Sequence, residues 1–136
     1  MRRFGIALIV VGAILIIAGG FTWGLVRSEL NDEKITVSAD AEHFGGNRVD
    51  GPFDAYYEAE VIQKHALERT DNNTYAELDR EDPRREVIMN ASFLRASLFT
   101  SIVSFGVAAL AAAIGAVFVA QGIGLILIDR KDESEQ

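Results

Sequence analysis

Two long apolar runs, one near each end of the chain, dominate its pattern of hydrophobic and polar positions. No charged residue occurs in the 23 positions from Phe4 to Val26, nor in the 33 positions from Ala96 to Ile128. A helix needs about 20 apolar residues to cross the roughly 30 Å of hydrocarbon in a bilayer. The pattern therefore predicts two transmembrane helices, over residues 4–26 and 96–128.

The second apolar run is longer than one bilayer requires, because as a helix it would extend about 50 Å at roughly 1.5 Å per residue. Its first turns carry hydroxyl side chains, so we expect the membrane core at about residues 104–126. The helix should begin earlier, since Asp82 suits an N-cap and Pro83 suits the first helical position. We predict one helix from Pro83 to about Ile128, whose part over 83–95 protrudes.

Between the spans, residues 27–95 form a polar region with weaker signals. A helix is predicted over about 52–70, where Pro52 stands at the start, acidic residues come early and basic residues come late. Residues 34–38 alternate in polarity, which indicates either a short strand or an extended connection.

Thr74 and Glu77 have the spacing of a capping box and predict a short helix over 74–80. The expected fold class is mainly α. It consists of a two-pass transmembrane helical hairpin with a small, mostly helical polar domain between the spans. The second span is continuous with a long protruding helix.

Small residues recur every fourth position through the long helix. The repeat comprises Ser92, Ala96, Thr100, Ser104, Ala108, Ala112, Ala116, Ala120 and Gly124. Small side chains let membrane helices approach closely, and lipid supplies no hydrophobic drive for their association. The six residues from Ser104 to Gly124 are therefore predicted helix-packing residues, although an alanine-rich span also produces such repeats by chance.

The first span has its own small residues. Gly5, Gly12 and Gly19 stand seven apart, and Gly20 and Gly24 form a GxxxG pair. Gly5, Gly12 and Gly19 complete the predicted helix-packing set, and the second span is their obvious partner. A homodimer or a foreign helix would use the same faces.

Charge is concentrated between the spans, where residues 27–95 hold 16 of the 20 acidic residues of a chain with net charge −7. Such an acidic domain offers phosphates no basic surface, so nucleic acid is not an expected partner. The chain contains no cysteine, which excludes disulfides, thiolate metal sites and thiol nucleophiles.

Four basic residues flank the outer ends of the spans: Arg2, Arg3, Arg130 and Lys131. Positive charge favours the cytoplasm, so we predict a plasma-membrane protein with cytoplasmic tails at 1–3 and 129–136 and an extracytoplasmic domain at 27–95. Six basic residues near the spans within the polar domain oppose this orientation, but the rule is weak for loops beyond about 60 residues. A cleaved signal peptide ending near Ala18 is the alternative for the first run, which is long for that role.

The stretch EAEVIQKHALER, residues 58–69, places His65 among glutamates. On a helix, Asp54, Glu58 and His65 share one face but spread over about 16 Å along the axis, so they cannot converge on one ion. Glu60 and Lys64 suit a solvent-side ion pair instead. A site formed by His43, His65 and a distant carboxylate would depend on the fold, and no catalytic, cofactor or metal residue is predicted.

Two further polar features call for partners. Arg84 and Arg85 oppose the dipole at the start of the long helix, so a tertiary acidic partner is expected. The candidates are Asp79, Glu81, Glu29, Asp32 and Glu33. Gln121, within the second span, is expected to hydrogen-bond across a helix interface.

Four short sequence motifs resemble those of a known family. They are VDGPF (49–53), KHAL (64–67), TYAELDREDP (74–83) and MNASFLRASLFTS (89–101). The chain resembles a family of short two-span actinobacterial membrane proteins whose members often bear the label of aromatic ring-opening dioxygenase, small subunit. The resemblance covers most of the chain and implies a membrane location and an actinobacterial origin.

The residues favour a non-enzymatic integral membrane protein. We expect an accessory or interaction subunit that contacts the lipid bilayer and binds other membrane or envelope proteins, or copies of itself, through its spans and external domain. Two alternatives stand beside it: a subunit of a dioxygenase-type enzyme, as the family label says, and a small oligomeric transporter or channel.

Overall fold

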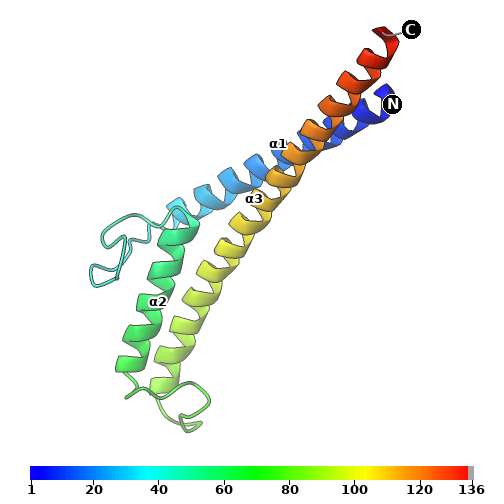
Figure 1. Ribbon diagram of the computed structural model, residues 1–136. Helices are drawn as coiled ribbons and strands as arrows, with labels where there is room; N and C mark the ends of the chain where they lie inside the picture. The colour runs from blue at the N-terminus through cyan, green and yellow to red at the C-terminus, as the bar shows by residue number, and fades with distance from the viewer. Residues whose placement is uncertain (135–136) are drawn as a thin grey trace. The chain divides into compact units, whose positions relative to one another are not determined.

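Three helices make up most of the computed structural model, which describes residues 1–134 (Figure 1). They are α1 (Arg2–Asp32), α2 (Pro52–Glu68) and α3 (Arg84–Ser134). The described chain contains no strand, so the expectation of a mainly α fold is confirmed. Both α1 and α3 are long and apolar enough to cross a membrane.

Helix α1 continues for six residues beyond the apolar run, from Arg27 to Asp32. Lys34 then adopts the left-handed conformation, with φ 54°, and its N–H donates to the Asn31 carbonyl oxygen at 3.1 Å. A left-handed residue after the last turn is a common way to end a helix. The turn directs the chain out of α1 and into the segment before α2.

Helix α2 begins as its sequence indicates. Gly51 is the N-cap in an extended conformation, and Pro52 occupies the first turn, where its missing N–H costs nothing. After the helix ends at Glu68, Asp71 and Asn72 both have positive φ, 52° and 61°. Asp and Asn tolerate this region better than most residues, so the chain reverses sharply at that point.

Helix α3 starts at Arg84, and Asp82 caps it by accepting a hydrogen bond from the Arg84 N–H to Oδ1 at 2.8 Å. The helix ends at Ser134. Residues 129–134, expected as a tail, are therefore helical. The last two residues of that expected tail, 135 and 136, lie outside the described residues.

The short helix expected over 74–80 is absent, and this stretch consists of turns. The capping contacts themselves form: the Thr74 N–H and Oγ1–H both donate to Glu77 Oε2 at 2.8 Å. These bonds satisfy one turn, and Arg80 to Asp82 then lead directly into α3. A capping box leads to a helix only if the residues after it extend the helix by further turns. Here the chain passes through turns and reaches the start of α3 at Arg84 before a helix can form.

Residues 34–38 form an extended connection with one isolated antiparallel bridge, between Thr36 and Arg48. The Val37 N–H donates to the Asn47 carbonyl at 2.8 Å and the Val49 N–H to the Ile35 carbonyl at 2.9 Å. Val37 and Val49 are almost fully buried, at 2% and 0% exposure. The pairing thus directs two valines of the α1–α2 loop into the interior.

The chain divides into two compact units. The first contains Met1–Leu25 of α1 and the part of α3 from Phe105 onward; the second is Val26–Ser104. The second unit, called here the polar domain, has a small core in which Leu67 and Ala91 pack against buried Ala66, Leu78 and Ile88.

Candidate functional site

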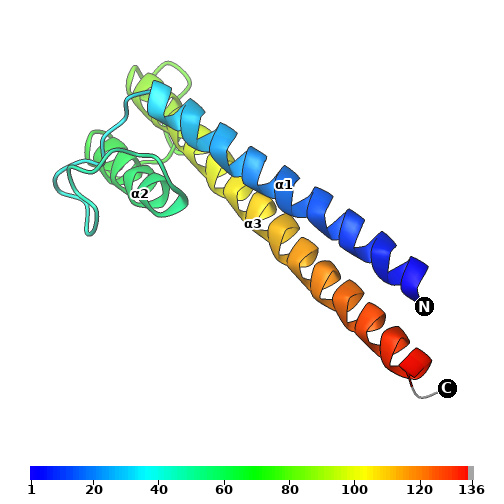
Figure 2. The ribbon, with the colours of Figure 1, turned by 90° about the horizontal axis from the view of Figure 1, so that it is seen from above.

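In the first unit, α1 and α3 lie side by side and antiparallel (Figure 2). Their contact repeats every seven residues: Gly5 faces Gly122, Gly12 faces Gly115, and Gly19 faces Ala108. We call these six residues the glycine seam. A seven-residue repeat keeps one stripe of a helix against its partner over several turns.

Glycine is required along most of this seam because the two backbones touch. A Cβ added to Gly12 would lie 2.5 Å from the Gly115 carbonyl oxygen, and one added to Gly115 would lie 2.5 Å from the Gly12 carbonyl oxygen. A Cβ added to Gly5 would lie 2.8 Å from the Gly122 carbonyl oxygen, and one added to Gly122 would lie 2.5 Å from the Gly5 carbonyl oxygen. Close backbone contact of this kind contributes van der Waals attraction between two helices.

Only part of the four-residue repeat predicted on α3 meets α1. At 100° per residue, each four-residue step turns by about 40°, so the repeat winds around the helix. Ala108 and Ala112 contact Gly19, whereas Ala116 and Ala120 are exposed. Gly124 and the Gly20–Gly24 pair have open space where a Cβ would stand, and Ser104 is half-buried.

Sequence reasoning missed Gly115 and Gly122 as seam residues. The signal was present: Ala108, Gly115 and Gly122 have the same seven-residue spacing as Gly5, Gly12 and Gly19. The seam could have been identified by looking for the same seven-residue spacing of small residues in both spans.

The outer faces of both helices carry large apolar side chains. Examples are Ile14, Ile17 and Phe21 on α1, exposed at 59, 71 and 71%, and Val103, Val107 and Leu110 on α3, at 65, 59 and 59%. Trp23 packs on Phe105 with ring centroids 4.6 Å apart. Gln121 is exposed and does not lie in the α1–α3 contact.

In the polar domain, Glu58 is a buried carboxylate on α2, with 7% exposure. Its Oε2 accepts the Ser38 N–H at 2.7 Å, and its Oε1 lies 3.3 Å from Ser38 Oγ. Buried carboxylates are tolerated when they are hydrogen-bonded. Glu58 therefore holds the α1–α2 loop against α2, a role that its place among other acidic residues in the sequence did not indicate.

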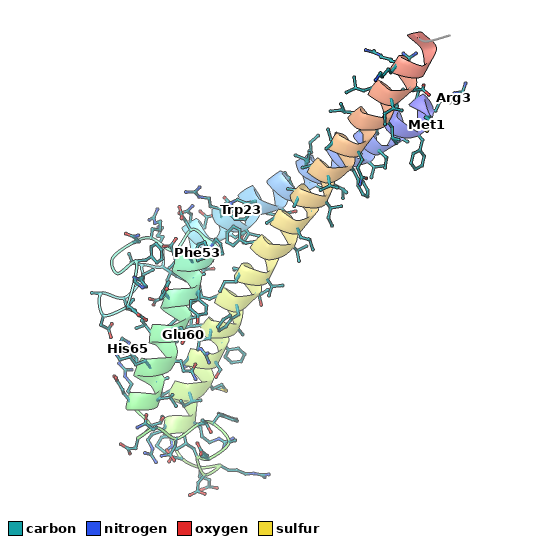
Figure 3. The ribbon with its side chains drawn as sticks, viewed as in Figure 1. Met1, Arg3, Trp23, Phe53, Glu60 and His65 are labelled. Atoms are coloured by element: carbon teal, nitrogen blue, oxygen red, sulfur yellow. The ribbon has the colours of Figure 1, made fainter. Side chains whose placement is uncertain are left out.

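His65 and Lys64 also bind this loop. Figure 3 shows the position of His65 on α2. His65 Nε2 lies 2.9 Å from Asp40 Oδ2, and Lys64 Nζ lies 3.1 Å from the same oxygen. The helical spacing predicted an ion pair between Lys64 and Glu60, but Lys64 pairs with Asp40 instead. The hydrogen bond from His65, and to a smaller extent the one from Lys64, holds the pKa of Asp40 below its usual value of 3.8.

Asp40→Asn should remove part of the acid sensitivity of this domain. A lowered pKa in the folded state stabilises the fold above the ordinary value of 3.8, and that contribution disappears as pH falls through the lowered value. Melting temperatures measured by circular dichroism should show a shallower decline below about pH 4 in the variant, together with an equally small loss at neutral pH, where the parent chain keeps the contribution of this exposed pair. Glu42→Gln, on the same loop, is the control, and an equal effect there would contradict the assignment.

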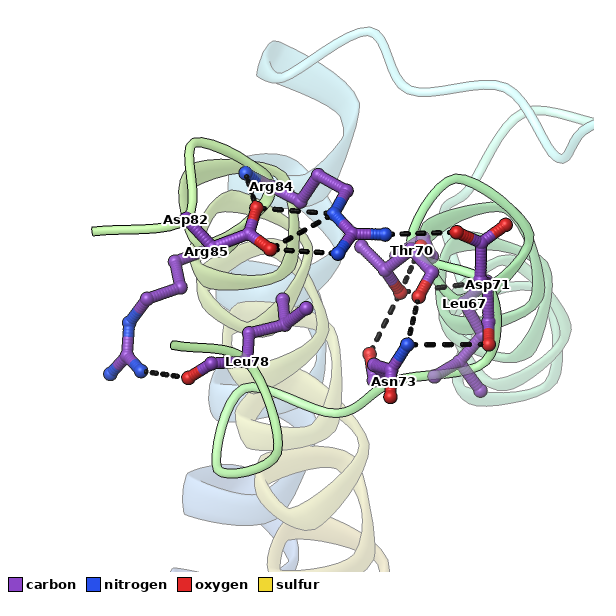
Figure 4. A network of polar contacts seen from close by, with 9 residues as sticks. Leu67, Thr70, Asp71, Asn73, Leu78, Asp82, Arg84 and Arg85 are labelled. Carbon is purple, nitrogen blue, oxygen red and sulfur yellow. Dashed lines mark hydrogen bonds and ion pairs between the residues drawn. The ribbon is translucent and has the colours of Figure 1, made fainter. Parts of the chain in front are cut away.

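The two arginines at the start of α3 have different partners (Figure 4). Arg84 pairs with Asp82 at 2.7 Å and with Asp71 at 2.9 Å. The guanidinium of Arg84 lowers the pKa of Asp82, and Asp82 raises the pKa of Arg84. An acidic partner was expected, but neither of these aspartates was among the candidates.

Within residues 1–134, Arg85 has no acidic partner and stacks on an aromatic ring instead. Its guanidinium carbon lies 3.9 Å from the Tyr75 ring centroid, and Nη1 donates to the Leu78 carbonyl oxygen at 2.7 Å. Thr70 is fully buried nearby, with its Oγ1 2.7 Å from the Asn73 carbonyl oxygen. These contacts fix the turns between α2 and α3.

A groove of about 350 Å³ lies in the polar domain between α2, the turns at 74–76 and α3. Ala66, Leu67 and Ile88 line its apolar part, with Gln63 and Arg95 among its polar lining residues. Arg95 Nε donates to the Ala59 carbonyl oxygen at 3.2 Å. The groove is at the small end of the range of ligand sites and suits an apolar side chain or a small ligand.

The two histidines do not form a metal centre with a carboxylate: within residues 1–134, no three His, Cys, Asp or Glu side chains are grouped to hold an ion. His65 meets Asp40, whereas His43 packs edge-on against Tyr57 with ring centroids 5.1 Å apart. His43 thus belongs to an aromatic contact between the loop and α2.

Comparison with known proteins adds no relative. No protein-family model, no curated protein and no solved structure matches the chain.

Proposed function

We propose that the chain is a non-enzymatic two-pass protein of the plasma membrane that binds other membrane or envelope proteins. The observation that carries this proposal is the glycine seam between two helices whose outer faces remain apolar. Such a pair has nothing left to pack its exposed side chains against except lipid or another helix. An accessory or interaction subunit fits this arrangement.

Burial supports the membrane location. In each of the two long helices, only 17% of the most apolar 18-residue window is buried. The core helix of a soluble protein has most of its apolar surface covered, and exposed apolar patches of this extent mark membrane or protein contact. Lipid would cover these faces.

The charges support an orientation with both termini in the cytoplasm. Arg2, Arg3 and Arg130 lie at the outer ends of the apolar runs, whereas the 9 basic residues of the polar domain belong to a loop longer than the roughly 60 residues over which the positive-inside rule is strong. Basic residues next to spans favour the cytoplasmic side. The polar domain would then be extracytoplasmic and available to envelope proteins.

Exposed apolar side chains on the polar domain support a role in protein binding. Phe93 and Met89, one turn apart on α3, are 68% and 41% exposed, and Leu94 beside them is 51% exposed. Aromatic residues and methionine are enriched in protein interfaces, where a few large side chains provide most of the affinity. This part of α3 is the surface we propose for the partner.

A photoreactive benzoyl-phenylalanine at position 93 tests the proposal. Irradiated in native membranes and purified in mild detergent, the full-length chain should carry an adduct to a second protein, identified by mass spectrometry. The same group at Glu60, on exposed α2 surface, is the control and should give none. Recovery of only uncross-linked monomer from position 93 would overturn the interaction proposal.

A further inference from the structure

The first turn of α2 presents two exposed aromatic rings. Phe53 is 70% exposed and Tyr56, three residues later on the same side, is 45% exposed. Asp54 stands between them, with its pKa raised by burial and by the charge of Asp50. Its Oδ2 lies 3.5 Å from the position of a Cβ on Gly51, so this carboxylate is turned back toward the start of the helix.

Contacts within the polar domain hold this turn beside the charged end of the first apolar run. Arg27 is the first charged residue after that run. Its Nη2 lies 2.6 Å from Asp50 Oδ2, and Asp50 is separated from the first residue of α2 only by Gly51. The first turn of α2 is therefore close to the residue at which α1 would leave the hydrocarbon.

A second contact independently places the first turn of α2 at the same depth relative to the proposed membrane. The rings of Tyr56 and Phe99 lie 6.4 Å apart. Phe99 stands five residues before the expected membrane core at 104–126, which is about 7.5 Å along a helix. Tyr56 is thus placed at the level of the lipid headgroups by α3 as well as by α1.

We infer that Phe53 and Tyr56 dock the polar domain onto the headgroup region of the leaflet from which the two spans emerge. Aromatic rings are enriched at this depth, because an apolar ring can enter the interface while a hydroxyl such as that of Tyr56 stays in water. The inference rests on the proposed membrane location. It adds that the polar domain itself, and not only the spans, binds lipid.

Tryptophan as a depth probe tests this contact. In full-length chain carrying Trp23→Phe, which removes the only native tryptophan, Phe53→Trp is reconstituted in phosphatidylcholine vesicles with a nitroxide on the headgroup or deep in the acyl chain. We expect the headgroup nitroxide to quench this tryptophan more strongly than the acyl-chain nitroxide does.

Tyr75→Trp is the matched control. Tyr75 is also an exposed aromatic residue of the polar domain, at 44% against 70% for Phe53. It contacts Arg85, which is 14 residues or about 21 Å along α3 from Phe99. Tyr75→Trp should keep its intensity with either nitroxide.

Ile14→Trp separates failure of the inference from failure of the proposed function. Ile14 is 59% exposed near the middle of α1, so the acyl-chain nitroxide should quench it. Quenching at position 14 with none at position 53 would overturn the lipid contact alone, and a partner protein would then be the better occupant. No quenching at position 14 would overturn the membrane location itself.

Discussion

Gly12→Leu should separate the two long helices of the first unit. The added Cβ would stand 2.5 Å from the Gly115 carbonyl oxygen and 2.8 Å from Val119 Cγ2, and backbone cannot yield as a flexible side chain can. Overpacking of a close contact costs about 1–3 kcal/mol, and the large leucine side chain should place this variant at the upper end. Titration with sodium dodecyl sulfate from a mild detergent measures the loss.

The chain provides its own reporter for this experiment. Trp23 is the only tryptophan and packs on Phe105 across the same helix pair. Its fluorescence should change at a lower dodecyl sulfate fraction in Gly12→Leu than in the parent chain. Gly20→Leu is the matched control, because nothing lies within 4 Å of a Cβ at that position. Equal destabilisation by both variants would show that α1 packs through another face.

Glu58→Ala should release the α1–α2 loop from α2. The variant leaves the Ser38 N–H without its partner 2.7 Å away. Removing one partner of a fully buried hydrogen bond costs about 1–3 kcal/mol, and because this bond is partly buried we expect the lower end of that range. The free energy of unfolding of the domain should fall by that amount in urea titrations followed by circular dichroism.

Amide hydrogen exchange adds a local measurement to the Glu58 experiment. The Ser38 amide should exchange much faster in Glu58→Ala, because the hydrogen bond to Glu58 that protects it from exchange is missing. Glu60→Ala removes a carboxylate two residues away that is exposed, and should leave both measurements unchanged. Glu58→Gln, which keeps one acceptor oxygen, should fall between the two alanine variants.

The helices were predictable from the sequence because each depends on local signals. Runs of apolar residues indicated α1 and α3, and the Pro52 and Asp82–Pro83 starts placed the beginnings of α2 and α3 within one residue. The helix expected over 74–80 failed for a related reason. Its capping contacts are local and do form, but continuation depends on the packing of Leu78 into a core that the local pattern does not describe.

The side-chain contacts of the polar domain were less predictable because they join distant segments. Asp40 lies 25 residues before His65, and Asp71 lies 13 residues before Arg84. Spacing along one helix suggested Glu60 for Lys64, yet the loop brings Asp40 closer. The pairing of Thr36 with Arg48 and the burial of Val37 and Val49 help to fix where that loop runs.

The register of the glycine seam has a consequence for biosynthesis. Gly12 and Gly115 are 103 positions apart, so at about 5–20 residues per second a ribosome adds the second glycine roughly 5–20 s after the first. Throughout that interval the small face of α1 has no intramolecular partner. Any neighbouring helix with small residues seven apart competes for it, including the α1 of a nascent second copy. Formation of the α1–α3 contact therefore depends on the order of synthesis as well as on the close packing of the two helices.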